Sequence, residues 1–344
     1  MEDEPWDSGM AEYALVLSRE LESRGHRVLF WGRPGCFPCR KARVWGLETV
    51  EARPWLGLPG LRRLLRRERV QVVNAHTGSS HSLAAIAAAG LKIALIRTRA
   101  DARPPKGGGA ARFLASRTAA YIAVNCVIEK DLAARFPGAR VRLVPQGLPE
   151  PSTRHPLAEE PAVGLLGRLD PVKGHADFLE AAALLRKRFP AARFLAAGGG
   201  GEDALARLSA QRDRLGLRGA AELPGFVRSS ENFMGSCRIG VVASHGSEAV
   251  SRAALEWMAQ GRPLVATEVG GLPDLVEDGK TGFLACPRSP SGLASAIGLL
   301  LADPVMAAEF GKNARARYEK FYGSPRFAAE TEKVYEEALH HLPS

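Results

Sequence analysis

Short apolar runs alternate along the chain with longer stretches in which apolar residues recur every three or four positions. In the first half, these runs predict strands at 27–31, 70–75, 93–97, 120–124 and 141–145. In the second half, they predict strands at 162–166, 193–197, 221–223, 239–243, 263–266 and 282–285. The stretches between them predict helices, for example at 10–24 and 80–89. This alternation is typical of α/β domains built on parallel sheets.

A break in the pattern divides the chain in two. Residues 148–162 hold four prolines and little apolar periodicity, so they predict a linker. We therefore expect two Rossmann-like domains, 1–150 and 151–324, that face each other across a cleft where a ligand can bind. A last helix at about 325–344 is expected to pack back on the first domain.

The first domain begins in an unusual place. The chain opens on what looks like the loop after a first strand, Trp6 to Gly9, so the central strand of that domain is expected to be missing. Losing such a strand would leave two unpaired sheet edges.

Composition agrees with two globular domains, since the chain has 344 residues, 46% hydrophobic and 24% charged. We find no run of about 18 apolar residues, and the acidic start resembles neither a signal nor a transit peptide. The expected location is the cytoplasm. Cys36 and Cys39 form a lone CxxC, and Pro34 and Pro38 predict a surface loop there, in place of the helix that a redox dithiol needs.

The net charge of +10 is unevenly placed, because all of the excess lies in residues 1–150. Such asymmetry favours an anionic partner, either a membrane surface or a phosphorylated acceptor. Nucleic acid would also suit the charge, but no nucleic-acid-binding motif accompanies it, so none is expected as a partner.

Two basic segments could carry this recognition. Residues 60–69 predict an amphipathic helix with Leu61, Leu64 and Leu65 on one face and arginines around it. We favour peripheral binding of this helix to an anionic membrane, at the inner face of the cytoplasmic membrane. The alternative is an ordinary helix that packs its leucines inward. Residues 97–103 hold three arginines, which could bind an acceptor phosphate or carboxylate or form a solvated loop.

The stretch 244–284 is the most informative part of the chain. A predicted strand ends at 243, a loop carries Glu248, and a helix at 253–259 carries Glu256 among apolar residues. The N–H groups at the start of such a helix suit a diphosphate or a sugar hydroxyl. A carboxylate on an apolar helix face needs hydrogen-bond donors, which ribose hydroxyls would supply. For Glu256, the alternatives are a salt bridge or a solvated helix face.

Two cations and a histidine stand at other strand ends. Arg168 and Lys173 flank a loop that leads into a helix near 174, where the helix dipole disfavours cations unless an anion lies between them. The alternative is a pair of exposed surface cations. His76 ends the apolar run 70–75, at the edge where ligands bind in open α/β sheets, or else it is a core histidine. We find no Asp-x-Asp or other metal-ligand spacing, so no metal site is expected.

The spacing of Glu248 and Glu256, with seven residues between them, resembles the E-x7-E motif of family 4 glycosyltransferases. The following segment, LEWMAQGRPLVATEVGGLPDLVEDGKTGFL, is similar to the family pattern almost position for position. Two departures are Ala249-Val250-Ser251, where the family commonly has Gly-Phe-Gly, and Asp274, where Glu is more usual. The resemblance covers nearly the whole chain and is strongest over 162–286.

This resemblance implies a GT-B enzyme that transfers a sugar from a nucleotide donor with retention of configuration and without a metal. Glu248 would hold sugar hydroxyls and Glu256 the ribose, while Arg168 and Lys173 would neutralise the diphosphate. His76 would contact the donor sugar. Further contacts with the donor are implied for Gly9, Gly199, Val227, Ala249, Val250 and Ser251.

The expected substrates are a UDP- or GDP-sugar and a glycan or lipid-linked acceptor, with hexosyl or heptosyl transfer in lipopolysaccharide or surface-polysaccharide assembly. Three alternatives stay open. They are a sugar-nucleotide epimerase of the same fold, a Rossmann dehydrogenase, whose dinucleotide fingerprint is missing, and a non-catalytic nucleotide-binding protein at the membrane.

Overall fold

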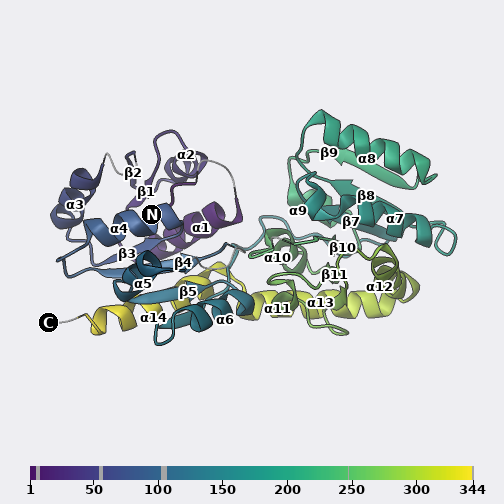
Figure 1. Cartoon of the computed structure of the whole chain (residues 1–344). Coiled ribbons are helices and arrows are strands. Elements are labelled where there is room, and N and C mark those ends of the chain that lie inside the picture. Colours follow the sequence, from purple (N-terminus) through teal and green to yellow (C-terminus); the bar gives the residue numbers. More distant parts are fainter. Residues whose placement is uncertain (5–7, 54–56, 102–106, 247, 343–344) are drawn as a thin grey trace. The chain divides into compact units, whose positions relative to one another are not determined.

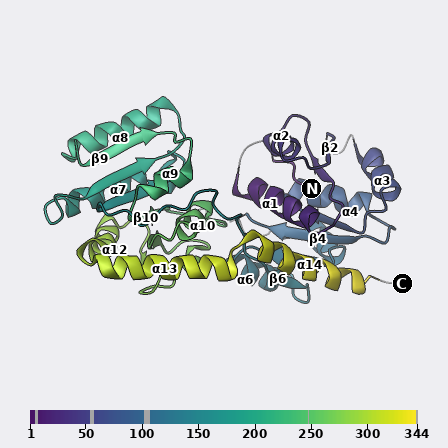
Figure 2. The same cartoon turned by 180° about the vertical axis from the view of Figure 1, so that it is seen from behind.

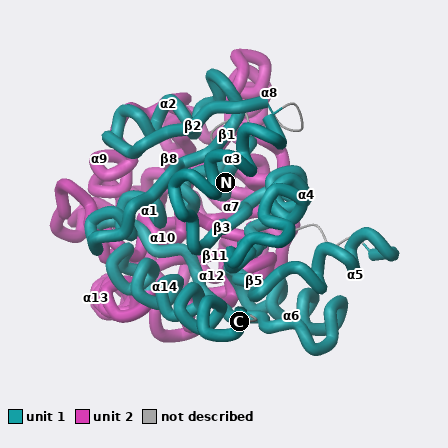
Figure 3. The backbone as a smooth tube through the Cα atoms, turned by 90° about the vertical axis from the view of Figure 1, so that its left-hand side faces the viewer, with its two compact units in different colours: residues 1–149, 322–344 teal, residues 150–321 magenta. Residues whose placement is uncertain are grey.

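A computed structural model describes residues 1–4, 8–53, 57–101, 107–246 and 248–342 (Figure 1). The chain forms two compact units, coloured separately in Figure 3. Unit 1 comprises Met1–Pro149 and Tyr322–Ser344, and unit 2 comprises Glu150–Phe321. Both are α/β units whose strands pair in parallel, so the predicted fold class is confirmed.

Unit 1 contains a four-stranded sheet in the order β3-β4-β5-β6 and a two-stranded sheet, β1-β2. Its strands are β1 (Phe30–Gly32), β2 (Thr49–Glu51), β3 (Val72–Ala75), β4 (Ala94–Arg99), β5 (Ala120–Ala123) and β6 (Val141–Leu143). Its helices are α1 (Gly9–Ser23), α2 (Phe37–Val44), α3 (Leu58–Arg67), α4 (Gly78–Ala87), α5 (Gly109–Ser116), α6 (Cys126–Arg135) and α14 (Ser324–His340). The strand β2 was not predicted, because its three residues are only partly buried and carry no clear alternation.

The backbone of Met1 and Glu2 bridges the two sheets of unit 1. No strand forms ahead of α1 in the described residues, as predicted. However, Met1 N donates to Asn74 O (2.6 Å), and its carbonyl accepts from His76 N (3.0 Å) beside β3. Glu2 N donates to Trp31 O of β1 (2.9 Å). These bonds occupy part of the two strand edges that a missing strand would expose.

The C-terminal helix belongs to unit 1. Figure 2 shows α14 running beside α1 and the sheet, and the two helices are in contact. Tyr13 and Phe327 meet edge to face with their ring centroids 4.6 Å apart, both fully buried. Such a pair adds to the burial energy of the two rings, so α14 contributes to the core of this unit.

Two sequence interpretations of unit 1 need correction. Cys36 and Cys39 do not lie in a surface loop: Cys36 is the N-cap of α2, Cys39 lies inside that helix, and both are buried. Pro38 fits the first turn because that position needs no N–H donor. The leucines of α3 face inward, since Leu61 and Leu65 are buried in a cluster with Trp31. The alternative, a helix that packs its leucines inward, is therefore observed, and peripheral binding of this helix to a membrane stays a prediction.

Unit 2 has one six-stranded parallel sheet in the order β12-β11-β10-β7-β8-β9. Its strands are β7 (Ala162–Leu166), β8 (Arg193–Ala197), β9 (Ala221–Gly225), β10 (Ile239–Val242), β11 (Leu264–Thr267) and β12 (Gly282–Ala285). Its helices are the 3-10 turn η1 (Pro171–Lys173), α7 (His175–Leu185), α8 (Glu202–Arg214), α9 (Ser230–Gly235), α10 (Arg252–Ala259), α11 (Leu272–Leu275), α12 (Pro290–Ala302) and α13 (Pro304–Phe321).

The strands of unit 2 are nearly continuous apolar runs because helices cover both faces of the sheet (Figure 1). The main core joins these strands to α7 and α12, with Phe178 and Phe194 in contact. No single helix of the described residues is long and apolar enough to cross a membrane. The consecutive helices α12 and α13 pass that test only as a pair, bent by 105°.

Candidate functional site

The loops that follow four strands of unit 2 meet at one edge of its sheet. Because the strands are parallel, their carboxyl ends share this edge, where open α/β sheets bind ligands. Backbone hydrogen bonds join the loops directly. They are Leu169 N to Gly199 O (2.8 Å), His245 N to Val172 O (2.7 Å) and Gly271 N to Glu248 O (2.7 Å). The loops after β7, β8, β10 and β11 thus form one connected structure.

Two glycines with positive φ let these loops approach closely. Gly174 (φ 72°) ends η1 and precedes α7, and a Cβ there would lie 1.9 Å from Ala243 O. Gly270 (φ 56°) follows β11, and a Cβ there would lie 2.2 Å from Glu248 O. Both positions combine a left-handed backbone with no room for a side chain, so each requires glycine.

Glu248 is the centre of this site. Its side chain is only 2% exposed, and its Oε1 accepts hydrogen bonds from Lys173 Nζ and Ser244 Oγ, each at 2.5 Å. The carbonyl of Ser244 accepts from Thr267 Oγ1 (2.6 Å), which fixes the loop on β11. A buried carboxylate is tolerated only with such partners. These contacts therefore fix the carboxylate of Glu248 at the sheet edge, where it can accept a hydrogen bond from a ligand.

The two predicted cations have different surroundings. Lys173 lies in η1, half-buried against Glu248. Arg168 is 73% exposed, and its one ion pair among the described residues is with Asp170, with 3.8 Å between Nη2 and Oδ2. The guanidinium of Arg168 is therefore free to bind an anion, while Lys173 has three N–H donors and can hold Glu248 and face a second acceptor.

Glu256 has the partner that the alternative interpretation named. It lies in α10 with a side chain 19% exposed, and its Oε1 accepts from Arg252 Nε at 2.7 Å. This is a salt bridge between residues four apart on one helix. Ala249 and Ser251, between the two glutamates, are buried, and Val250 is half-buried.

The remaining predicted residues of unit 2 lie after β8 and at the end of β9. Gly199 is half-buried, with a carbonyl that accepts from Leu169 N, and Val227 is half-buried just beyond β9. Phe226, which precedes Val227, is 75% exposed, and a Cβ on Gly199 would lie 3.7 Å from its ring. Phe226 was not identified from the sequence, because a single aromatic residue beside a turn is common and predicts no function.

The pair formed by His245 and Asp177 was also not identified from the sequence. His245 Nε2 lies 2.8 Å from Asp177 Oδ2, with both side chains largely buried. Asp177 is in the first turn of α7, and His245 directly follows Ser244 in the loop after β10. The pair ties the loop that carries Glu248 to a helix. No sequence spacing announces it, since the two residues are 68 positions apart.

Unit 1 holds the other two predicted residues. His76 follows β3 and is buried beside Tyr13, and no described residue bonds its Nδ1. Burial holds the pKa of His76 well below its usual range, so the ring is neutral. Gly9 is the first residue of α1, where Ser8 Oγ caps Ala11 N (3.1 Å). Trp6 and Asp7 lie outside the described residues.

The predicted basic loop at 97–103 is wrong in its first half. Arg97 and Arg99 belong to β4, and Arg97 is buried, with Nη1 bonded to Ala75 O at 2.9 Å. Burial lowers the pKa of Arg97 to about 9. Arg103 lies outside the described residues, so three arginines on one exposed loop are not observed there. In the described part of the chain, no three His, Cys, Asp or Glu residues are grouped to hold a metal.

Two family profiles match the chain, one over each half. Glycosyltransferase Family 4 matches residues 8–150, and Glycosyl transferases group 1 matches residues 160–303. A D-inositol 3-phosphate glycosyltransferase of Corynebacterium jeikeium is 34% identical over 190 residues, which are 51% of this chain and 43% of the relative. A GDP-mannose-dependent alpha-(1-6)-phosphatidylinositol monomannoside mannosyltransferase of Mycolicibacterium smegmatis is 34% identical over 193 residues, 54% of this chain and 48% of the relative.

This chain spans about half the length of the curated relatives that it matches. The structure of Anabaena Alr3699/HepE in complex with UDP superposes with a TM-score of 0.84, at 21% identity, over 97% of this chain and 98% of that one. That likeness identifies the fold as GT-B. The two profiles, which together cover most of the chain, show that it belongs to the family 4, group 1 glycosyltransferases.

Proposed function

We propose that this protein transfers a sugar from a nucleotide-sugar donor to a hydroxyl acceptor, with retention of anomeric configuration and without a metal ion. One observation carries the proposal: Glu248 is buried at the carboxyl edge of the sheet with Lys173 and Ser244 bound to the same oxygen. Lys173 holds Oε1, so the second oxygen of Glu248 can accept from a sugar hydroxyl. The nearby Arg168 is free to bind the diphosphate.

In this proposal the departing diphosphate gains negative charge, which Arg168 and Lys173 offset in place of a metal. Glu256 holds the ribose, and His76 in its neutral form contacts the donor sugar. Gly9, Gly199 and Val227 approach the donor through their backbones, and Ala249-Val250-Ser251 shape the sugar pocket. The acceptor hydroxyl attacks the anomeric carbon from the face that the diphosphate leaves, and it gives its proton to the departing phosphate oxygen as the bond to the diphosphate breaks.

The substrate classes follow from the charge of the chain and from its relatives. HepE binds UDP, and the mycobacterial relative uses GDP-mannose, so a UDP- or GDP-sugar is the proposed donor. The two curated relatives described above are named for inositol 3-phosphate and for phosphatidylinositol monomannoside, which agrees with an acceptor that bears phosphate and with the excess positive charge of residues 1–150. We propose hexosyl or heptosyl transfer to a glycan or lipid-linked acceptor in lipopolysaccharide or surface-polysaccharide assembly, at the cytoplasmic face of the membrane.

A thermal-shift screen of UDP-, GDP- and ADP-sugars would identify the donor, since a bound ligand raises the apparent stability by mass action. Transfer with that donor should fall at least about 100-fold in Glu248→Gln, because the amide cannot replace the carboxylate charge. Glu202→Gln, an exposed change at the start of α8, is the matched control. Nuclear magnetic resonance of the product would report the anomeric configuration, and EDTA should leave the rate unchanged.

Three results would contradict the proposal. Unchanged transfer by Glu248→Gln would exclude the proposed role of that carboxylate. Inversion of the donor sugar without an acceptor would indicate an epimerase. Thermal shifts by nucleotides without turnover of any sugar, combined with vesicle binding, would indicate a non-catalytic protein.

A further inference from the structure

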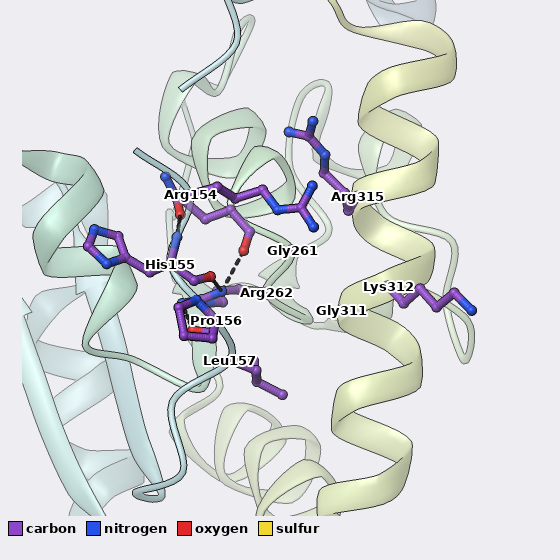
Figure 4. Close-up of a pocket in the computed structure, with 10 residues that line it drawn as sticks. Arg154, His155, Pro156, Leu157, Gly261, Arg262, Gly311, Lys312 and Arg315 are labelled. Atoms are coloured by element: carbon purple, nitrogen blue, oxygen red, sulfur yellow. Dashed lines mark hydrogen bonds between the residues drawn. The ribbon is translucent and has the colours of Figure 1, made fainter. Parts of the chain in front are cut away.

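Unit 2 contains a cavity of about 350 Å³, and none of the residues that line it belongs to the loops around Glu248. Its walls are the chain segment 154–157, the end of α10 at Gln260 and Gly261, and the middle of α13 from Gly311 to Arg315 (Figure 4). All of these belong to unit 2. The site described above includes none of its lining residues, although Gln260, Gly261 and Arg262 lie in the family-like segment 255–284.

The lining carries positive charge and no carboxylate. Arg154, Arg262, Lys312 and Arg315 line the cavity, and its other lining residues are uncharged or histidine. Figure 4 shows the Arg154 side chain extending toward α13, which carries Arg315, while the Lys312 side chain extends away from both arginines. Two like charges that converge on one space repel each other unless an anion lies between them.

Arg262 is the least ordinary of these cations. It is 1% exposed, and its three nitrogens donate only to backbone carbonyls, among them His155 O (3.1 Å), Pro156 O (2.7 Å) and Gln260 O (2.5 Å). Burial lowers its pKa to about 10, which leaves the guanidinium charged at neutral pH. In the described part of the chain no carboxylate pairs with it, so its charge reaches the cavity without a counter-ion.

The acidic partners in the neighbourhood belong to Arg315. Its Nη2 contacts Glu150 (2.7 Å), its Nε contacts Glu319 (2.6 Å), and its Nη1 donates to Ala259 O (2.8 Å) at the end of α10. The two carboxylates neutralise the charge of Arg315 and at most one of the other three cations of the lining. Among the described residues, no carboxylate lies within salt-bridge distance of Arg154 or Lys312, so the cavity keeps a net positive potential.

The walls are also fixed before any ligand binds. Gln260 accepts from His155 N (3.2 Å) and donates to Thr153 O (2.7 Å), and Arg262 donates to the carbonyls of His155 and Pro156. The segment that carries Arg154 is therefore tied to the end of α10. A rigid wall lowers the entropy cost of binding a small ligand.

From this arrangement we propose that the cavity between residues 154–157, α10 and α13 binds a small phosphate-bearing anion, separate from the donor substrate. A dianionic phosphate matches the exposed guanidinium of Arg154, which can bind phosphate oxygens in pairs, together with the buried positive charge of Arg262 in the same lining. The segment 154–157 and α10 both contact the ligand in this site. Because α10 also carries Glu256, an anion here would stiffen the helix that the proposed donor site uses.

Inorganic pyrophosphate is the probe, and isothermal titration calorimetry on the full chain is the measurement. We expect saturable binding that becomes at least about tenfold weaker in Arg154→Ala, which loses a charge-assisted contact. The matched control is Arg214→Ala, which removes an exposed arginine from the last turn of α8. Arg154 is exposed, so its replacement leaves the core intact, and Arg154→Lys should restore part of the binding by charge alone.

Pyrophosphate could also enter the proposed donor site, so Arg168→Ala is titrated in parallel. Binding that persists in Arg168→Ala and falls in Arg154→Ala supports the second site, whether or not the protein proves to be a transferase. Binding lost in Arg168→Ala and kept in Arg154→Ala would assign the anion to the donor site and overturn the proposal. Equal weakening by Arg154→Ala and Arg214→Ala would show attraction to surface charge alone, and would overturn it too.

Discussion

At the scale of single residues, the site depends on backbone positions as much as on charged side chains. Gly174 separates Lys173 from α7 and lies against the carbonyl of Ala243, where the loop to Glu248 begins. A side chain there would separate the two loops that bring Lys173 to Glu248. The carboxylate and its ammonium partner therefore meet because a residue next to one of them lacks a Cβ.

Gly174→Ala should lower the free energy of unfolding more than Gly216→Ala does. Both glycines have positive φ, 72° and 67°, so each change costs about 1–2 kcal/mol of backbone strain. Only Gly174 also meets a carbonyl, whereas nothing lies within 4 Å of a Cβ on Gly216. Urea unfolding should show an additional loss of about 1–3 kcal/mol in Gly174→Ala. Equal losses would mean that the loops separate freely.

A second residue-scale prediction tests the ribose role of Glu256. Glu256→Gln removes a helix salt bridge with Arg252, which costs about 0.5 kcal/mol or less. If Glu256 also holds the ribose, the KM for the donor should rise at least about tenfold while stability hardly changes. Steady-state kinetics and urea unfolding measure the two effects separately. An unchanged KM would leave Glu256 with the salt bridge alone.

The sequence predicted on which element or loop each of these residues lies, but not which residues contact one another. The strand at 239–243 and the helix after it put Glu248 in a loop and Glu256 on a helix, as observed. It could not pair Glu248 with Lys173, because they are 75 positions apart and meet only when four loops pack together. The His245–Asp177 pair was missed for the same reason, since its members are 68 positions apart.

At the scale of elements, periodicity located helices but left open what covers their apolar faces. The arginine-rich helix predicted at 60–69 exists as α3, and three strands of unit 2 begin and end where predicted. Whether Leu61 and Leu65 face lipid or protein depends on the elements that fold over them, which a local pattern does not contain. The CxxC was misjudged because Pro38 can begin a helix as well as break one.

Membrane binding through α3 should depend on its arginines and not on its leucines. Leu65→Ala should cost about 2–5 kcal/mol of stability, because Leu65 is in the core of unit 1. Arg66→Glu replaces an exposed cation, so it should leave stability nearly unchanged and weaken sedimentation with vesicles rich in anionic lipid. The control for total charge is Arg186→Glu, which makes the same change at an exposed position of unit 2. Equal sedimentation of Arg66→Glu and the wild type would exclude α3 as the contact.

At the scale of the whole molecule, buried histidines couple folding to pH. Burial lowers the pKa of His175 to about 4 and that of His81 to about 3, and that of His76 also lies well below its usual value. An unfolded histidine titrates near pH 6.5. As the pH falls below that value, the unfolded chain binds protons that the native chain does not, so these three residues reduce stability on acidification.

His175→Gln should isolate one of these contributions. Between pH 6.5 and about 4, the wild type should lose up to about 1.4 kcal/mol of unfolding free energy per pH unit relative to the variant. Above pH 7 the difference between the two should be constant, since His175 is neutral in both states. Urea unfolding across pH 4.5–8 measures the comparison. Curves that stay parallel throughout would mean that His175 has the same pKa in the native and the unfolded chain.

The return of α14 to unit 1 makes that unit discontinuous in sequence, while unit 2 is one uninterrupted segment. A ribosome therefore completes unit 2 before it releases the residues that cover Tyr13. Unit 2 has everything it needs to fold during synthesis, whereas unit 1 must wait with part of its core open. The part of the protein that is translated first is thus the last to be finished, and in that interval it is the part most exposed to chaperones and proteases.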